Sequence, residues 1–151
     1  MTSSALVPED EGPIELRLIK MYEAIHFHDL ALAKGGGLSG VRDHNALQSA
    51  LYAPERHLYY TDRLVTLPEL ASVMAYELVK QHSFNDGNKR TAALLVPVFM
   101  RAHGIRWRPR HAELIRKMLA IAESSADGES RERVVQETAL WIELSKAEYV
   151  S

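Results

Sequence analysis

A short polar break between two apolar helical stretches constrains this chain more than any other feature. The stretch before the break begins with Leu67-Pro68-Glu69-Leu70, in which a proline and an acid occupy a first helical turn. The stretch after it, from Thr91 to His103, is mostly apolar and stops at Gly104, a common helix end. The pattern therefore predicts two helices joined by a short break at Asn85-Asp86-Gly87.

The break and its flanks carry the residue types that phosphate transfer requires. His82 provides an imidazole, whose ordinary pKa of about 6.5 suits a general base near neutral pH. Asp86 offers hard carboxylate oxygens for a divalent metal ion. Phosphate oxygens favour fixed cations and the N–H groups of a helix N-terminus. Four consecutive residues can supply these donors and charges: Gly87, Asn88, Lys89 and Arg90.

Each of these residues also has an ordinary structural explanation when it is considered alone. His82 continues the apolar face of the first helix, so a hydrogen-bonded core histidine is an open alternative. Asp86 suits a turn or a helix N-cap. Lys89 and Arg90 suit a solvated helix face. Phe84 is expected in the core in either case, where it would anchor the loop.

At these positions the chain resembles the Fic/Doc (Fido) family. Lys89 stands where Fic enzymes have glycine, and Ala93 stands where they have a second arginine. Both departures are similar to the Doc branch, whose motif runs Asn-Lys-Arg-Thr-Ala. The stretch from Gly36 to Asp43 also resembles Doc, and the likeness extends from about Leu16 to Trp141. The Fic motif, His-x-Phe-x-Asp/Glu-Gly-Asn-Gly-Arg-x-x-Arg, is matched at His82, Phe84, Asp86, Gly87, Asn88 and Arg90.

The resemblance implies a Doc-like toxin of a type II toxin-antitoxin system. Such a protein would be a Ser/Thr kinase that phosphorylates elongation factor Tu with ATP and halts translation, and an antitoxin would block its nucleotide. His82 would act as base, Asp86 would hold Mg²⁺, and Lys89 with Arg90 would stabilise the transferred charge. The nucleotide-binding residues implied are Phe84, Gly87, Asn88, Lys89 and Arg90. A Fic-like protein AMP transferase and an inactive Fido-fold binding module stay open as alternatives.

An inhibitory helix of the kind that some Fic proteins carry is not expected in this chain. Ser125 and Glu129 have the required spacing, but Gly128 interrupts the helix between them. Restraint by a separate antitoxin chain is therefore the expectation.

Composition limits the class of protein. The chain has 151 residues, no cysteine and a net charge of −2, and these values favour one domain over residues 13–151, behind a loose tail over 1–12. No stretch approaches the roughly 20 apolar residues of a membrane span. We expect a cytoplasmic protein with no membrane contact and no direct nucleic-acid binding. One basic cluster is expected to be a solvated face: Arg101, Arg106, Arg108, Arg110, Arg116 and Lys117.

Helical periodicity along the rest of the chain predicts an all-α bundle of about six helices, in agreement with the compact Fido fold that the resemblance implies. The other expected segments are a helix over 13–34, a short helix from Asp43 through Leu51, an irregular stretch over 53–66, a connector over 105–110, a helix that buries Leu114, Ile115, Met118 and Leu119, and a last helix marked by Val134, Val135, Trp141 and Ile142.

Overall fold

Six helices make up the part of the chain that the computed structural model describes, which is residues 15–149, with side chains described through Lys146. Within that part, the only β pairing is an isolated antiparallel bridge between Val41 and Phe84. None of the described helices is long and apolar enough to cross a membrane. The expected all-α bundle is confirmed. Its helices are α1 (Met21–Gly35), α2 (His44–Tyr60), α3 (Leu67–Lys80), α4 (Asn88–Ala102), α5 (His111–Glu123) and α6 (Gly128–Tyr149).

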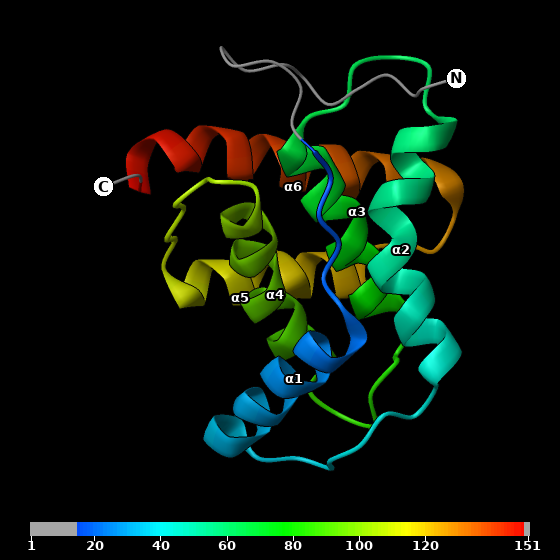
Figure 1. Ribbon diagram of the computed structural model, residues 1–151, viewed down its shortest axis with the longest axis vertical. Helices are drawn as coiled ribbons and strands as arrows, with labels where there is room; N and C mark the ends of the chain where they lie inside the picture. Colours follow the sequence, from blue (N-terminus) through cyan, green and yellow to red (C-terminus); the bar gives the residue numbers. More distant parts are fainter. Residues whose placement is uncertain (1–14, 150–151) are drawn as a thin grey trace.

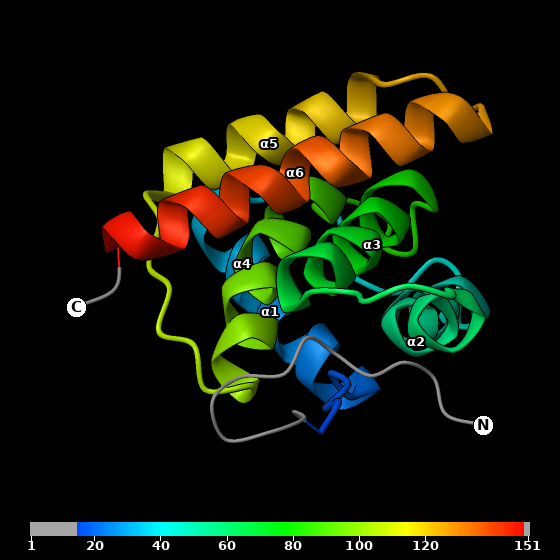
Figure 2. The ribbon, with the colours of Figure 1, turned by 90° about the horizontal axis from the view of Figure 1, so that it is seen from above.

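Helices α3 and α4 form the centre of the molecule. Figure 2 shows α5 and α6 side by side on one side of them, with α1 and α2 on the other. Helix α3 contacts α2, α4, α5 and α6, and every residue from Leu67 to Tyr76 is buried. A helix that is buried on all sides belongs in the core of a bundle. The loop between α3 and α4 therefore begins and ends on helices that are fixed by packing.

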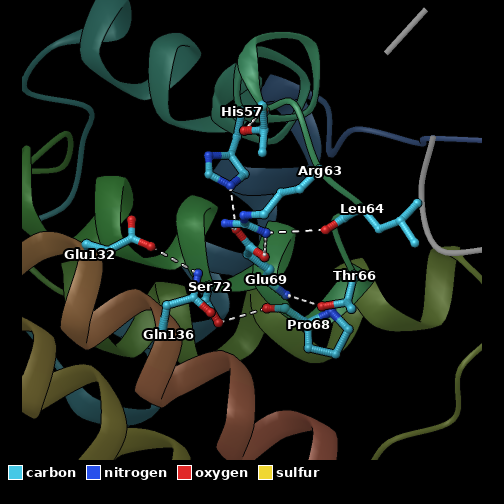
Figure 3. Close-up of polar contacts among 10 residues, drawn as sticks. His57, Arg63, Leu64, Thr66, Pro68, Glu69, Ser72, Glu132 and Gln136 are labelled. Carbon is cyan, nitrogen blue, oxygen red and sulfur yellow. Dashed lines mark hydrogen bonds and ion pairs between the residues drawn. The ribbon is translucent and has the colours of Figure 1, made fainter. Parts of the chain in front are cut away.

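Contacts of the buried Glu69 with His57 and the half-exposed Arg63 connect the end of α2 to the start of α3 (Figure 3). Glu69 is 4% exposed, and its Oε2 lies 2.6 Å from Nε2 of His57 and 2.7 Å from Nη2 of Arg63. Burial by itself would raise the pKa of Glu69, but hydrogen bonds from His57 and Arg63 outweigh burial and lower that pKa to about 2. Thr66 caps α3 through a 3.2 Å bond from the Glu69 N–H. Glu69 is therefore ionised and paired at neutral pH.

The expected helix over 13–34 is wrong at its start, because α1 begins only at Met21. The N–H of Lys20 donates to Oε1 of Glu23 at 2.8 Å, which closes the N-terminus of the helix there. The preceding residues are not helical, and the N–H of Arg17 donates instead to Nε2 of His103 at 2.9 Å. The expected tail over 1–12, like residues 13 and 14, lies outside the described residues.

The expected end of the second helix at Leu51 is also wrong. Asp43 caps α2 as predicted, with Oδ1 accepting from the Ala46 N–H at 3.0 Å, but the helix continues through Pro54 to Tyr60. A proline inside a helix removes one backbone hydrogen bond. Pro54 and Leu51 are both buried, and packing of α2 against α3 outweighs that local loss. The stretch expected to be irregular is thus mostly helical.

The interior face of α5 differs by one position from the expected face. Leu114 and Met118 are buried as predicted, and Ile121 continues the same face at helical spacing. Leu119 lies next to this face and is 42% exposed. The connector over 105–110 is confirmed as non-helical, and α6 contains the four residues that marked the last helix. Of those four residues, all but the half-buried Trp141 are buried.

Candidate functional site

The predicted break is confirmed as the α3–α4 loop, since α3 ends at Lys80 and α4 begins at Asn88. The side chain of His82 is exposed, so the alternative of a core histidine is wrong. His82 also has a φ of +51°, and it is the only non-glycine residue with a positive φ in the described part of the chain. Its imidazole forms no hydrogen bond with any described residue, which leaves both ring nitrogens available to a bound molecule.

One pocket of about 390 Å³ collects almost all of the predicted site residues. Val79 and Ala122 form an apolar part of the pocket wall. Asn85 adds an amide to the lining, although the sequence analysis had placed this residue only in the break between the helices. Of the seven predicted residues, Phe84 alone does not line this pocket. The six that do are His82, Asp86, Gly87, Asn88, Lys89 and Arg90.

Phe84 supports the loop from inside. It is 1% exposed, and its ring stacks on the His28 imidazole with centroids 3.9 Å apart and planes 7° from parallel. A ring buried in this way cannot contact a nucleotide in the pocket, so the implied assignment of Phe84 to direct nucleotide binding is not supported. Its expected place in the core is confirmed.

The side chain of Asn88 also serves the loop. Its Oδ1 accepts from the Phe84 N–H at 3.0 Å, and its Nδ2 donates to the Phe84 carbonyl at 3.1 Å. Both ends of the amide are therefore used to close the turn between the two helices. The backbone N–H of Asn88 and the second N–H of its Nδ2 are the donors left to meet a phosphate, which narrows the role that the resemblance implied for this residue.

The start of α4 has the features of an anion-binding helix terminus. The first bond of its hydrogen-bond ladder runs from the Thr91 N–H to the Gly87 carbonyl at 2.9 Å. The N–H groups of the three residues in between precede the ladder, so the helix itself leaves them unpaired. Gly87 has a φ of +74°, which glycine adopts without strain. Lys89 is exposed beside these groups, and Arg90 is held by a 3.2 Å bond from Nη1 to the Ala31 carbonyl.

Asp86 presents an ionised carboxylate to solvent. Its Oδ1 accepts from the Gly87 N–H at 2.8 Å and its Oδ2 lies 3.4 Å from the Leu38 nitrogen. These two bonds, and then the charges of Arg90 and Lys89, lower the pKa of Asp86. No group of three or more His, Cys, Asp or Glu side chains suited to a metal occurs in the described part. A single carboxylate does fit Mg²⁺, which commonly completes its coordination with water and substrate phosphates.

Two supporting features were missed from the sequence. His28 is buried, and its Nε2 lies 2.8 Å from the Asp86 carbonyl oxygen. The only feature of the sequence that pointed to this role was the position of His28 on the same face of α1 as Ala24 and Ala31. The glycines after α1 do more than stop a helix. At Gly37, where φ is +123°, a Cβ atom would lie 2.7 Å from Oδ2 of Asp86.

The connection between α1 and α2 lies against the motif loop, and Figure 1 shows the two connections close together at the foot of the molecule. The N–H of Asn85 donates to the Gly40 carbonyl at 3.1 Å, and its Nδ2 donates to the Ser39 carbonyl at 2.9 Å. The N–H groups of Arg42 and Asp43 both donate to the Ser83 carbonyl, at 2.8 and 3.1 Å. The stretch that resembles Doc outside the motif is thus part of the same site.

The basic cluster does not line the motif pocket. Its arginines are exposed, as expected for a solvated face, and Lys117 is half-buried. Three of the cluster residues border a separate hollow of about 310 Å³: Arg101, Arg106 and Arg108.

Comparison with known proteins agrees with this geometry. The model of the Fic/DOC family matches residues 18–100, which contain α1, α2, α3, the motif loop and all but the last two residues of α4. The chain is 29% identical over 90 residues to the protein kinase doc of Escherichia phage P1, across 60% of this chain and 71% of that protein. It is 33% identical over 75 residues to the toxin Doc of Mycolicibacterium smegmatis, across 50% of this chain and 57% of that toxin. Both relatives are Doc proteins, and the family match spans more than half of the chain. This chain therefore belongs to the Fic/DOC family and to its Doc branch.

Proposed function

We propose that this chain is a Doc-like toxin that transfers the γ-phosphate of ATP to a serine or threonine hydroxyl of a protein. The observation that carries the proposal is the pocket at the start of α4, where a free imidazole, an ionised carboxylate and two cations meet unpaired helix N–H groups. Similarity to a protein named as a kinase supports the same chemistry. Phosphoryl transfer needs mainly positioning and charge stabilisation, which these groups provide.

In the proposed reaction, the hydroxyl oxygen of the target attacks the γ-phosphorus while His82 accepts the hydroxyl proton. The bond from the γ-phosphorus to the bridging oxygen breaks, and ADP leaves. Lys89, Arg90 and the N–H groups of the first turn of α4 stabilise the charge on the transferred group. Asp86 would hold Mg²⁺, which supplies further neutralisation of the phosphate charge.

The charges around the pocket favour γ-phosphate transfer over AMP transfer. Lys89 and Arg90 are the cations among the residues that line it. Ala93 is fully buried and lines the separate hollow of the basic cluster, so no cation stands where the Fic motif has its second arginine. Because no cation at position 93 can bind the outer phosphates, we infer that ATP binds with its terminal phosphate beside His82.

The test is the fate of two labels. The purified chain is incubated with Mg²⁺, elongation factor Tu as the proposed target, and ATP labelled at the α or the γ phosphate. Label should reach the target only from the γ position, with a mass gain of one phosphate on a threonine or serine. His82→Ala should lower transfer by about 10²–10⁴-fold, whereas His26→Ala, an exposed histidine on α1 that does not line the pocket, should not.

The other outcomes identify the alternatives. Transfer from the α position would replace the kinase proposal with protein AMP transfer. A folded wild-type chain that binds no ATP in Mg²⁺ would favour an inactive binding module. Label transfer to another protein of the translation machinery, with elongation factor Tu unlabelled, would keep the kinase and change its target.

We further propose that a separate antitoxin restrains this chain in the cytoplasm. Ser125 lies in the turn before α6 and Gly128 begins that helix, so the spacing between Ser125 and Glu129 does not form a helical inhibitory motif. His82, Asp86 and Lys89 are exposed to a second protein. Expression of this chain alone should arrest growth, and co-expression of a small protein from the adjacent reading frame should restore growth. Normal growth with abundant soluble wild-type protein would contradict both the proposed toxicity and the proposed need for an antitoxin.

A further inference from the structure

The backbone at the proposed base is in a conformation that histidine does not favour. His82 has a φ of +51°, in the left-handed region, and it follows directly on Gln81, the C-cap of α3. A non-glycine residue is kept in this region only where its surroundings determine its conformation. The contacts around the His82 peptide groups therefore decide where the imidazole points.

Arg42 supplies these contacts from the neighbouring connection. Its Nε donates to the His82 carbonyl at 2.8 Å, and its Nη2 donates to the Gln81 carbonyl at 3.2 Å. The backbone N–H of the same residue donates to the next carbonyl, that of Ser83, at 2.8 Å. One residue thus binds three consecutive carbonyl groups at the end of α3, on both sides of the imidazole.

We propose that Arg42 is a positioning residue for His82, which holds the imidazole toward the pocket by fixing its backbone in the left-handed conformation. This inference rests on the proposed function only in taking His82 as the base. Arg42 does not line the motif pocket, so it acts through the loop and not on the phosphates.

The chemistry of the contact explains why an arginine suits this position. The planar guanidinium presents N–H groups in a fixed fork, which can reach two neighbouring carbonyls at once. Lysine offers one ammonium group on a flexible stem and can satisfy only part of the pair. A positive charge at the C-terminal end of α3 also interacts favourably with the helix dipole. A lysine at position 42 keeps the positive charge and should therefore restore part of the positioning of His82. Full positioning should need the guanidinium fork of arginine.

The contacts on the other side of the loop leave this role to Arg42. His28 binds the Asp86 carbonyl and stacks on Phe84, and Asn88 binds both backbone groups of Phe84. These contacts fix the second half of the loop, where the metal ligand and the anion site lie. Loss of Arg42 should therefore disturb the base and spare the nucleotide site.

The experiment compares Arg42→Ala, Arg42→Lys and wild type, with Arg56→Ala as the matched control. Arg56 lies on α2, is exposed, and donates to the Ser49 carbonyl at 3.0 Å, but it does not contact the loop. We expect Arg42→Ala to lower kcat for γ-phosphate transfer by about 10- to 100-fold, since a misplacement of about 1 Å can cost 10²-fold. The KM for ATP should stay within about twofold, and Arg42→Lys should recover part of kcat.

A second measurement does not depend on activity. With labelled histidine, the imidazole resonances of the full chain can be recorded by NMR, and His82→Ala identifies the His82 signal among the seven histidines. Arg42→Ala should shift or broaden that signal, and Arg56→Ala should leave it in place. Far-UV circular dichroism of each variant shows whether the bundle is still folded.

The outcomes separate this inference from the proposed function. An unchanged His82 resonance in folded Arg42→Ala overturns the inference, as does an unchanged kcat in a chain whose wild type is active. A rise in the KM for ATP with kcat retained also overturns it, because Arg42 would then serve the nucleotide. If wild type transfers no phosphate to any protein, the proposed function fails and the resonance comparison alone decides the role of Arg42.

Discussion

Replacement of His82 by glycine should remove the proposed activity and make the protein more stable. The φ of His82 is +51°, which glycine adopts freely and other residues adopt at a cost. The imidazole is exposed and has no hydrogen-bond partner among the described residues. Its removal therefore loses little packing, and the change in backbone strain decides the sign of the stability change.

The magnitude follows from two opposing terms. The left-handed conformation costs a non-glycine residue about 1–2 kcal/mol, and glycine recovers that cost. The unfolded chain gains freedom at a glycine, which offsets about 0.5–1 kcal/mol of the recovery. The net gain in the free energy of unfolding is then on the order of 1 kcal/mol. A domain of this size shifts its Tm by roughly 2–4 °C for each kcal/mol.

The comparison requires three variants and two assays. His82→Gly and His82→Ala both lack the base, so both should lose phosphate transfer. His82→Ala keeps the strain, so His82→Gly should melt above both wild type and His82→Ala. His82→Asn should fall between the glycine and alanine variants because asparagine tolerates this region. Thermal and urea unfolding give the stabilities. If His82→Gly melts no higher than His82→Ala, the strain does not exist and the reasoning from φ fails.

Three further predictions test other parts of the structure. The pKa of Glu69 is lowered from 4.5 to about 2, so this group stabilises the fold fully above pH 4.5, and the stabilisation is lost as the pH falls through 2. Glu69→Gln should remove this pH dependence, which is on the order of 3 kcal/mol, when urea unfolding is measured against pH. Asp86→Asn should weaken ATP binding in Mg²⁺ more than in its absence by calorimetry, while the exposed Asp62→Asn should change neither. Gly37→Ala would place a Cβ atom 2.7 Å from Oδ2 of Asp86, whereas Gly36→Ala adds a Cβ at a positive φ that meets no atom within 4 Å. Gly37→Ala should therefore lower activity more than Gly36→Ala, and equal losses would mean that backbone strain alone, without the clash, lowers the activity.

The part of the fold that could be predicted from the sequence is the part that local rules determine. The start of α3 at Leu67, the cap at Asp43 and the start of α4 after Gly87 each depend on residues within a few positions. Motif residues are close in sequence, so their meeting in one pocket also follows from local structure. Only Phe84 lies outside the pocket, because its ring is buried in the core against His28 of α1.

The features that were missed depend on contacts between distant segments. Helix α2 continues through Pro54 because Ala53 and Pro54 are buried where α2 packs against α3, and no local rule shows this packing. The side chain of His28 meets the loop 58 residues later, and the fork of Arg42 meets carbonyls about 40 residues later. His82 was expected to continue the apolar face of α3, but that helix ends two residues earlier and the backbone then turns. The spacing of apolar residues predicts that a helix continues as long as the spacing does, and it contains no information on where the backbone turns.

Support and chemistry are divided between different residues in this loop. The buried or hydrogen-bonded side chains of His28, Phe84 and Asn88 bind the backbone or each other. The groups suited to act on a phosphate, among them His82 and Lys89, are exposed and contribute little to holding the loop. A loss of activity at a supporting residue is therefore not evidence of contact with substrate, since the loop itself would change. Stability and activity should separate only at the exposed residues, and this separation identifies which motif residues take part in the reaction.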